Sequence, residues 1–156
     1  MFEAIEVLRY PLHGAEVRVG VMIGAGLNVC RCGSWDYQWM RPTVLIVDDH
    51  EAFRASARAL LEAEGFRVIG QAGDGMEAVA AVAALRPDIV LLDIQLPGPD
   101  GLAVAEQLAS RSDPPAVVLI SSRDAAAYGP RLREVPARGF IPKSGLSGEA
   151  LAAMVG

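Results

Sequence analysis

The sequence has very little lysine. Lys143 is its only lysine, and the other thirteen basic residues are arginines. Either residue makes a surface soluble, so a single lysine in the stretch 139–145 (GFIPKSG) suggests that this position requires a compact ammonium group. Cysteine is also scarce. Cys30 and Cys32 cannot form a disulfide framework, and a C-x-C pair alone is a weak metal signal, so we interpret them as incidental thiols.

Long apolar runs and a basic excess are absent as well. No run reaches the roughly 18–20 apolar residues that a membrane span needs, and the first residues are acidic where a signal peptide would be basic. The net charge is −5, with a pI near 5.0, which gives no indication of a nucleic-acid or anionic-membrane partner. We therefore expect a cytoplasmic protein without direct DNA or membrane binding. The 156 residues suffice for one domain with a real core.

The composition of the chain changes near residue 40. Both tryptophans, both cysteines and two of the three tyrosines precede this point, whereas the net negative charge belongs to the residues after it. Within the first part, 17–22 can form a short strand. We expect residues 1–40 to be an N-terminal extension that is poorly ordered or reflects a misassigned start, with Met40 as the alternative start. Residues 41–156 then form the main domain.

Residues 41–156 alternate between short apolar runs and helical patterns. Strands are predicted at 44–47, 67–70, 89–92, 117–120 and 140–141, and helices at 53–61, 76–85, 102–109 and 148–155. Strands that alternate with helices indicate a parallel sheet, and continuous apolar strands indicate burial on both faces. Five strands fit a doubly wound α/β domain with the flavodoxin-like order 2-1-3-4-5, a three-layer sandwich. Because Gly129-Pro130 and Pro136 interrupt 123–138, we expect a shortened fourth helix.

Polar residues follow the predicted strands where each one ends. Asp48 and Asp49 follow the first strand, Asp93 the third, Ser121 the fourth and Lys143 the fifth. In open α/β sheets ligands bind outside the carboxyl ends of the strands, so these side chains are expected at one edge. Taken singly, the acids can be helix caps or turn formers, the serine a loop hydroxyl and the lysine a solvated charge.

Three carboxylates at one edge repel one another unless a pKa rises or a cation binds. Oxygen ligands beside a crevice favour Mg²⁺, which uses one or two carboxylates together with phosphate oxygens. A carboxylate can also act as a nucleophile and form an aspartyl phosphate. Mg²⁺, the Ser121 hydroxyl and the Lys143 ammonium can then each neutralise one oxygen of a phosphoryl group.

The residues in this pattern resemble the receiver domain of two-component response regulators. The likeness covers Thr43 to Gly156 and rests on the motifs VLIVDDHEAFR (44–54), AGDGMEA (72–78), PDIVLLDIQLPGPDG (87–101), VVLISS (117–122) and ARGFIPK (137–143). The family signature D-x-x-[hydrophobic]-P-x-x-x-G is intact from Asp93 to Gly101. The sequence departs from the family pattern around the lysine, because Pro142 precedes it and Ser144 follows it.

The resemblance implies a role for each residue at the acidic end. Asp93 is expected to be the phosphoacceptor and Asp49 a direct Mg²⁺ ligand, with Asp48 acting mainly through water. The backbone carbonyl of Gln95 would complete the protein ligands. Lys143 matches the lysine of the family pattern.

The resemblance also implies a conformational switch. Ser121 matches the switch hydroxyl, and Phe140 matches the aromatic residue that turns inward when that hydroxyl moves. Phe140 alone can equally be a core residue. The expected shortening of the fourth helix affects the surface that normally transmits the output.

We therefore predict a stand-alone receiver that takes a phosphoryl group from a sensor histidine kinase or a phosphotransfer protein and signals to an output protein. It would catalyse its own phosphorylation and dephosphorylation but would not be a metabolic enzyme. Because only 144–156 follow Lys143, we expect no DNA-binding domain in this chain. Two alternatives remain: a degenerate receiver that binds partners without phosphorylation, and a haloacid-dehalogenase-like phosphohydrolase, which expects D-x-D after the first strand and a cap region.

Overall fold

The computed structural model describes residues 6–12, 15–21 and 41–156. The chain divides into two units, Met1–Trp35 and Asp36–Gly156, which are described separately. In the first unit, β1 (Glu6–Leu12) and β2 (Ala15–Val21) form an antiparallel pair. The strand expected at 17–22 overlaps β2, whereas no strand is predicted at the position of β1. Cys30, Cys32 and the alternative start at Met40 lie outside the described residues.

The second unit alternates strands and helices along its whole length. Its elements are β3 (Thr43–Val47), α1 (Glu51–Ala63), β4 (Arg67–Ala72), α2 (Gly75–Leu85), β5 (Ile89–Asp93), α3 (Gly101–Ala109), β6 (Ala116–Ser121), the 3₁₀-helix η2 (Ala125–Tyr128), α4 (Arg131–Glu134), β7 (Gly139–Pro142), the 3₁₀-helix η3 (Lys143–Gly145) and α5 (Gly148–Val155). All strand pairs in its sheet are parallel, in the order β4-β3-β5-β6-β7. Counted from the first strand of the domain this is 2-1-3-4-5, so the predicted fold is confirmed. In the described ranges, no helix has both the length and the apolar character that a membrane crossing requires.

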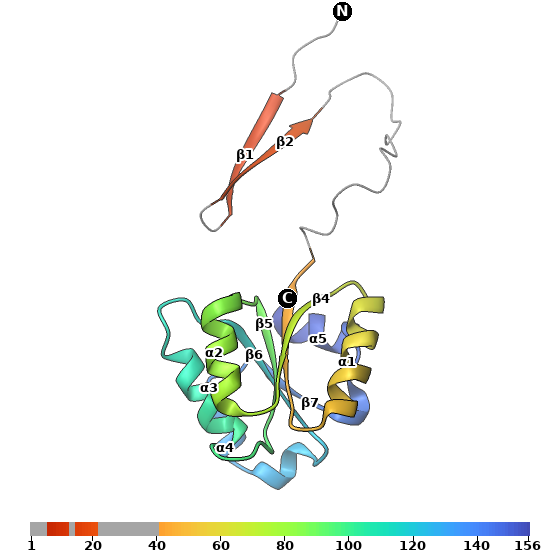
Figure 1. The fold of residues 1–156 in the computed structure, drawn as a ribbon, viewed down its shortest axis with the longest axis vertical. Helices are drawn as coiled ribbons and strands as arrows, with labels where there is room; N and C mark the ends of the chain where they lie inside the picture. The colour runs from red at the N-terminus through yellow and green to blue at the C-terminus, as the bar shows by residue number, and fades with distance from the viewer. Residues whose placement is uncertain (1–5, 13–14, 22–40) are drawn as a thin grey trace, which may run out of the picture. The chain divides into compact units, whose positions relative to one another are not determined.

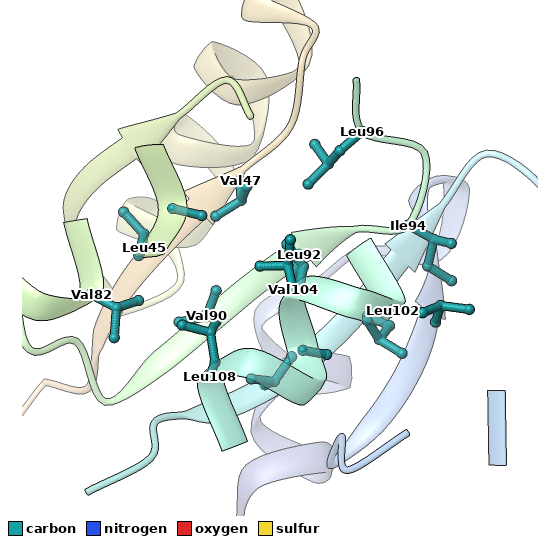
Figure 2. Packing of buried hydrophobic residues seen from close by; sticks show 14 of the residues in the cluster. Leu45, Val47, Val82, Val90, Leu92, Ile94, Leu96, Leu102, Val104 and Leu108 are labelled. Carbon is teal, nitrogen blue, oxygen red and sulfur yellow. The ribbon is translucent and has the colours of Figure 1, made fainter. Parts of the chain in front are cut away.

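Helices cover both faces of this sheet, because the central strands are apolar on both sides. In Figure 1, α1 and α5 lie on one face, and α2, α3 and α4 lie on the other. Residues Val44 to Val47 of β3 and Val90 to Leu92 of β5 are fully buried. Figure 2 shows how Leu45, Val90 and Leu92 pack against residues of α2 and α3. The opposite faces of the same strands pack against α1 and α5. This burial fixes the central strands and therefore the positions of the residues at their ends.

Short polar side chains cap three of the helices at their N-termini. The side chains of Asp74, Asp100 and Ser147 each accept a hydrogen bond from the backbone N–H three residues later, at 2.8–3.0 Å. Such caps satisfy amide groups that have no partner inside the helix, and each typically stabilises a protein by about 1 kcal/mol. Asp100 thereby fixes the start of α3, immediately after the loop that follows Asp93.

The segment between β6 and β7 is built differently from the other crossovers. It contains only two four-residue elements, η2 and α4, and neither contributes a buried residue. Gly129 separates them at φ +56, and Pro130 caps α4. A proline removes an amide donor and ends the preceding helical hydrogen-bond pattern. The predicted shortening of the fourth helix is thus confirmed, and the two prolines and the glycine explain it.

Candidate functional site

The strand register brings the polar strand ends together. Val47 pairs with Leu92, Asp93 with Ile120, and Ser121 with Pro142. The residues after these pairs therefore emerge at the same edge of the sheet. Asp48 is fully buried and Asp93 is 1% exposed, which is unusual for carboxylates without partners. The structure thus places the acids expected from the sequence next to each other.

Lys143 is the partner of both buried acids. Its Nζ donates a hydrogen bond to Oδ2 of Asp93 at 3.1 Å and lies 2.5 Å from Oδ2 of Asp48. The same ammonium sits 4.6 Å from the centroid of the Phe53 ring, which belongs to the first turn of α1. An aromatic face attracts a cation that has lost part of its water. The lone lysine is therefore held by two carboxylates and one ring.

Backbone contacts hold the first acid in place. The Asp48 N–H donates to the carbonyl of Ala72 on β4 at 3.0 Å. Arg54 Nη1 donates to the carbonyl of Asp48 at 2.6 Å, so α1 is tied to the end of β3. The Asp48 Oδ1 atom accepts from the backbone N–H of His50 at 2.8 Å. Because several elements hold Asp48, its position is set before any ligand arrives.

A close backbone approach holds the second acid. The backbone N–H of Gln95 donates to Asp93 Oδ1 at 3.2 Å, and the N–H of Gly101 donates to the carbonyl of Ile94 at 2.9 Å. A Cβ at Gly101 would lie 2.1 Å from the carbonyl oxygen of Asp93. Residue 101 must therefore be glycine for the loop to close beneath Asp93. This contact gives a physical reason for the eight-residue spacing between the aspartate and the glycine.

Burial and ion pairing shift the pKa values of both Asp93 and Lys143. Burial raises the pKa of the Asp93 carboxyl above its ordinary value, and the hydrogen bonds from Lys143 and Gln95 only partly offset this effect. Burial acts to lower the pKa of Lys143, but the hydrogen bonds and charges of Asp48 and Asp93 together raise it. The ammonium is therefore charged at neutral pH and stabilises the Asp93 carboxylate, whose ionised form is disfavoured by burial.

The acids also have the ligand chemistry of a cation site. Asp48, Asp49, His50 and Asp93 each offer one ligand atom, and these atoms lie within 4.8 Å of one another. Among the described residues, Asp48 Oδ2 is the one buried side-chain oxygen without a hydrogen bond of good geometry, despite its ion pair with Lys143. Carboxylate oxygens with spare acceptor capacity suit Mg²⁺. The residues present thus fit the divalent cation expected from the sequence.

The hydroxyl at the end of β6 is hydrogen-bonded to the segment that follows this strand. Ser121 is fully buried, and its Oγ lies 2.5 Å from the Tyr128 hydroxyl and accepts from the Arg123 N–H at 3.0 Å. Phe140, on β7, is partly buried, and its ring centroid lies 6.3 Å from that of Tyr128 at a tilt of 56°. Ser121 and Phe140, the expected switch pair, are thus both in contact with Tyr128.

A pocket of about 460 Å³ lies between the acidic residues and the β6–β7 segment; it is lined by Asp49, Ile94, Gln95, Leu96, Pro97, Asp100, Leu102, Tyr128 and Arg131. The Gln95 side chain accepts a hydrogen bond from the Ser122 hydroxyl at 3.2 Å. Arg131 pairs with Asp100 at 3.1 Å, which ties α4 to the start of α3. Both contacts join residues after β6 to the loop that follows Asp93.

Three residues near the site were not predicted from the sequence. His50 lies 2.8 Å from Asp49, Phe53 contacts Lys143, and Tyr128 contacts Ser121. Phe53 belongs to the apolar stripe of a helix, so the sequence assigns it to the core. Tyr128 had a possible signal, because it is the only tyrosine after residue 40 and lies in a segment rich in alanine, glycine and proline.

Comparisons with known proteins identify the family of this chain. The model of the response regulator receiver domain matches residues 44–155. The positive alginate biosynthesis regulatory protein of Pseudomonas aeruginosa is 43% identical over 102 residues, 64% of this chain and 40% of that protein. A protein-glutamate methylesterase/protein-glutamine glutaminase of Myxococcus xanthus is 48% identical over 80 residues, 51% of this chain and 23% of that protein.

A solved structure gives the same result. The signal receiver domain of the response regulator NarL of Mycobacterium tuberculosis superposes with a TM-score of 0.66 at 34% identity, covering 74% of this chain and 98% of that one. The chain spans less than half the length of the curated relatives named above. With its matching fold, acidic edge and family model, the chain belongs to the response regulator receiver family of two-component signal transduction.

Proposed function

We propose that this receiver accepts a phosphoryl group on Asp93 from the phosphohistidine of a sensor histidine kinase or phosphotransfer protein. The observation that supports this most directly is the pairing of the buried Asp93 carboxylate with the Lys143 ammonium at 3.1 Å, beside Asp48 and Asp49. This arrangement places a nucleophilic oxygen next to groups that neutralise an incoming phosphoryl group.

The transfer is a substitution at phosphorus. A carboxylate oxygen of Asp93 forms the new P–O bond while the P–N bond to the donor imidazole breaks. The electron pair of that bond goes to the imidazole nitrogen, which leaves as neutral histidine after taking up a proton. Lys143 stays charged and pairs with one phosphoryl oxygen, and the Ser121 hydroxyl turns to donate to another.

Mg²⁺ would be held by Asp49 and Asp93, by the backbone carbonyl of Gln95, and by Asp48 mainly through water. When bound, it offsets the repulsion between these carboxylates and the phosphoryl oxygens. The protein atoms prepare this site by fixing Asp48 and Asp93 through backbone hydrogen bonds.

The output is proposed to be a change in protein–protein contact. The curated relatives include a regulatory protein and a methylesterase, which shows that this family serves different outputs. In residues 41–156 the chemistry supports self-catalysed phosphorylation and dephosphorylation rather than metabolic turnover. We propose a protein partner for these residues and no direct contact with DNA.

Intact-mass spectrometry after incubation with acetyl phosphate and Mg²⁺ tests this proposal. We expect one phosphoryl adduct on the wild type and on Asp113→Asn, which changes an exposed aspartate by the same chemistry. Asp93→Asn should take up none, and chelation of Mg²⁺ should suppress the adduct on the wild type.

Other outcomes identify the alternatives. Sustained turnover of phosphate esters would indicate a phosphohydrolase. A wild type without an adduct and without binding of beryllium fluoride would indicate a receiver that acts without phosphorylation.

A further inference from the structure

Tyr128 and Arg123 supply the hydrogen-bond partners of the Ser121 hydroxyl. A serine hydroxyl has one proton and two acceptor lone pairs. In this structure the Ser121 Oγ accepts from the Arg123 N–H and shares a hydrogen bond of 2.5 Å with Tyr128. Within the described ranges, both partners of this hydroxyl belong to the segment after β6, and neither belongs to the acidic site.

A phosphoryl group on Asp93 would therefore compete with Tyr128 for this hydroxyl. To donate to a phosphoryl oxygen, Ser121 has to turn from the segment after β6 toward the neighbouring strand β5. The Tyr128 hydroxyl then loses its partner in a half-buried position. An unpaired polar group is costly there, whereas rotation toward solvent restores its hydrogen bonds.

Tyr128 is also linked to the second switch residue. Its ring packs against Phe140, and both rings lie against the core between the sheet and α2 and α3. When the Tyr128 ring leaves, Phe140 gains space to turn inward. Interiors are close-packed, so one ring can enter only where another withdraws.

The segment that carries Tyr128 is attached by few contacts. Arg131 of α4 pairs with Asp100, but both side chains are largely exposed, at 66% and 40%, and such pairs contribute little stability. Leu132 is only partly buried, and Val135 is the buried anchor at the end of the segment. Release of Tyr128 can therefore move residues 125–134 without disturbing the sheet.

We propose that Tyr128 is a positioning residue that holds the Ser121 hydroxyl in the unphosphorylated state and is released when Asp93 carries a phosphoryl group. Its release lets Phe140 turn inward and frees residues 125–134 to contact a partner. The inference rests on the proposed function, and it adds a second aromatic residue to the expected switch. Thermodynamically, the Tyr128–Ser121 contact favours the inactive conformation, so ligands of Asp93 must overcome it.

The binding of beryllium fluoride, which mimics a phosphoryl group, tests this role of Tyr128. Its affinity is measured by calorimetry in the presence of Mg²⁺. Tyr128→Phe keeps the ring and removes only the hydroxyl. Losing one hydrogen bond from the inactive state should tighten binding by about two- to tenfold. Ser110→Ala removes a different hydroxyl, which donates to Gln107 at 2.7 Å at the end of α3, and should leave affinity unchanged.

A double variant separates this mechanism from a general loosening of the fold. If Tyr128 acts through Ser121, adding Tyr128→Phe to Ser121→Ala should give no further gain in affinity. Hydrogen exchange of residues 125–134 should accelerate in Tyr128→Phe to the level of the liganded wild type. Unchanged or weaker binding by Tyr128→Phe, or an equal gain in the Ser121→Ala background, would overturn the inference while the proposed function stands. A wild type that binds no beryllium fluoride and takes up no phosphoryl group would overturn both.

Discussion

The two halves of the functional edge are built in opposite ways. On the acidic half, Asp48 and Asp93 are buried, and they are held by hydrogen bonds to the carbonyl of Ala72 on β4 and from the backbone N–H groups of His50 and Gln95. On the switch half, η2 and α4 contribute no buried residue, and side-chain contacts hold them. The difference supports the proposal that the acidic half is preorganised for chemistry and that the switch half, residues 125–134, can change conformation at a small free-energy cost.

This contrast follows from the elements that carry each half. Asp48 and Asp93 continue strands whose side chains are buried on both faces, so moving them would disturb the core. Tyr128 and Arg131 belong to two four-residue elements that lie on either side of Gly129 and Pro130, and such short elements can rearrange at little cost. Catalytic groups gain from rigidity and switch segments from bistability.

The largest expected effect comes from a substitution that displaces the backbone of the acidic half. Gly101→Ala places a Cβ 2.1 Å from the carbonyl oxygen of Asp93 and 2.7 Å from the Ile94 Cα. The backbone must shift, so we expect a loss of about 3 kcal/mol or more in the free energy of unfolding and little phosphorylation. Urea denaturation measures the free energy of unfolding, and intact-mass spectrometry measures the extent of phosphorylation.

Gly73→Ala is the matched control for this substitution. Its Cβ would meet the nearest atoms at 3.5 Å, an ordinary contact, so the cost should stay below about 1 kcal/mol. If both variants lost a similar amount of unfolding free energy, the close contact between Gly101 and the Asp93 carbonyl would not explain the need for glycine at position 101.

The next effect concerns the lone lysine. Lys143→Arg keeps the charge, but a planar guanidinium replaces an ammonium that fits between two carboxylates and the Phe53 ring. We expect phosphorylation by acetyl phosphate to slow by about tenfold or more, corresponding to roughly 1.4 kcal/mol.

Arg138→Lys exchanges the same two residue types at an exposed position just before β7 and should behave like the wild type. If Lys143→Arg also matched the wild type in phosphorylation rate and in switching, the single lysine would be an accident of composition.

A smaller effect follows from the raised pKa of Asp93. Its folded pKa lies above the unfolded value of 3.8 because of burial, so the folded state favours the protonated acid. The Asp93 carboxyl therefore contributes fully to the free energy of unfolding when the pH is below its unfolded pKa. This contribution is lost as the pH rises through its folded pKa. In metal-free buffer, Asp93→Asn should therefore be more stable than the wild type at pH 7, with a gap that narrows toward about pH 4. Urea denaturation midpoints of both proteins between about pH 4 and pH 7 measure this difference in stability. A difference that widens toward acidic pH would contradict burial as the cause of the raised pKa of Asp93.

The smallest expected effect lies on the switch half. Arg131→Ala removes an exposed ion pair and should lower global stability by less than about 1 kcal/mol. Hydrogen exchange should nevertheless accelerate in residues 125–134. Arg58→Ala removes a comparable ion pair with Glu62 on α1 and should not affect that segment. Equal protection of 125–134 in both variants would show that the switch half is more firmly held than we infer.

The sequence by itself determined the sheet, its order and the acids at its edge. Apolar strands alternating with helical segments permit few topologies, and parallel strands bring their carboxyl ends together. Asp48, Asp49, Asp93, Ser121 and Lys143 could therefore be grouped without coordinates. The prolines and the glycine between β6 and β7 also predicted a short fourth helix.

Only the tertiary structure decided which groups touch one another. The burial of Asp93, the Phe53 ring over Lys143 and the Tyr128 hydroxyl on Ser121 depend on side-chain directions and on packing across elements, which no local pattern specifies. The strand β1 was missed because no periodicity marks it. The sequence places Lys143 at the edge because a strand ends there, whereas the structure shows why an ammonium fits: two carboxylates and a ring leave room for a compact charge.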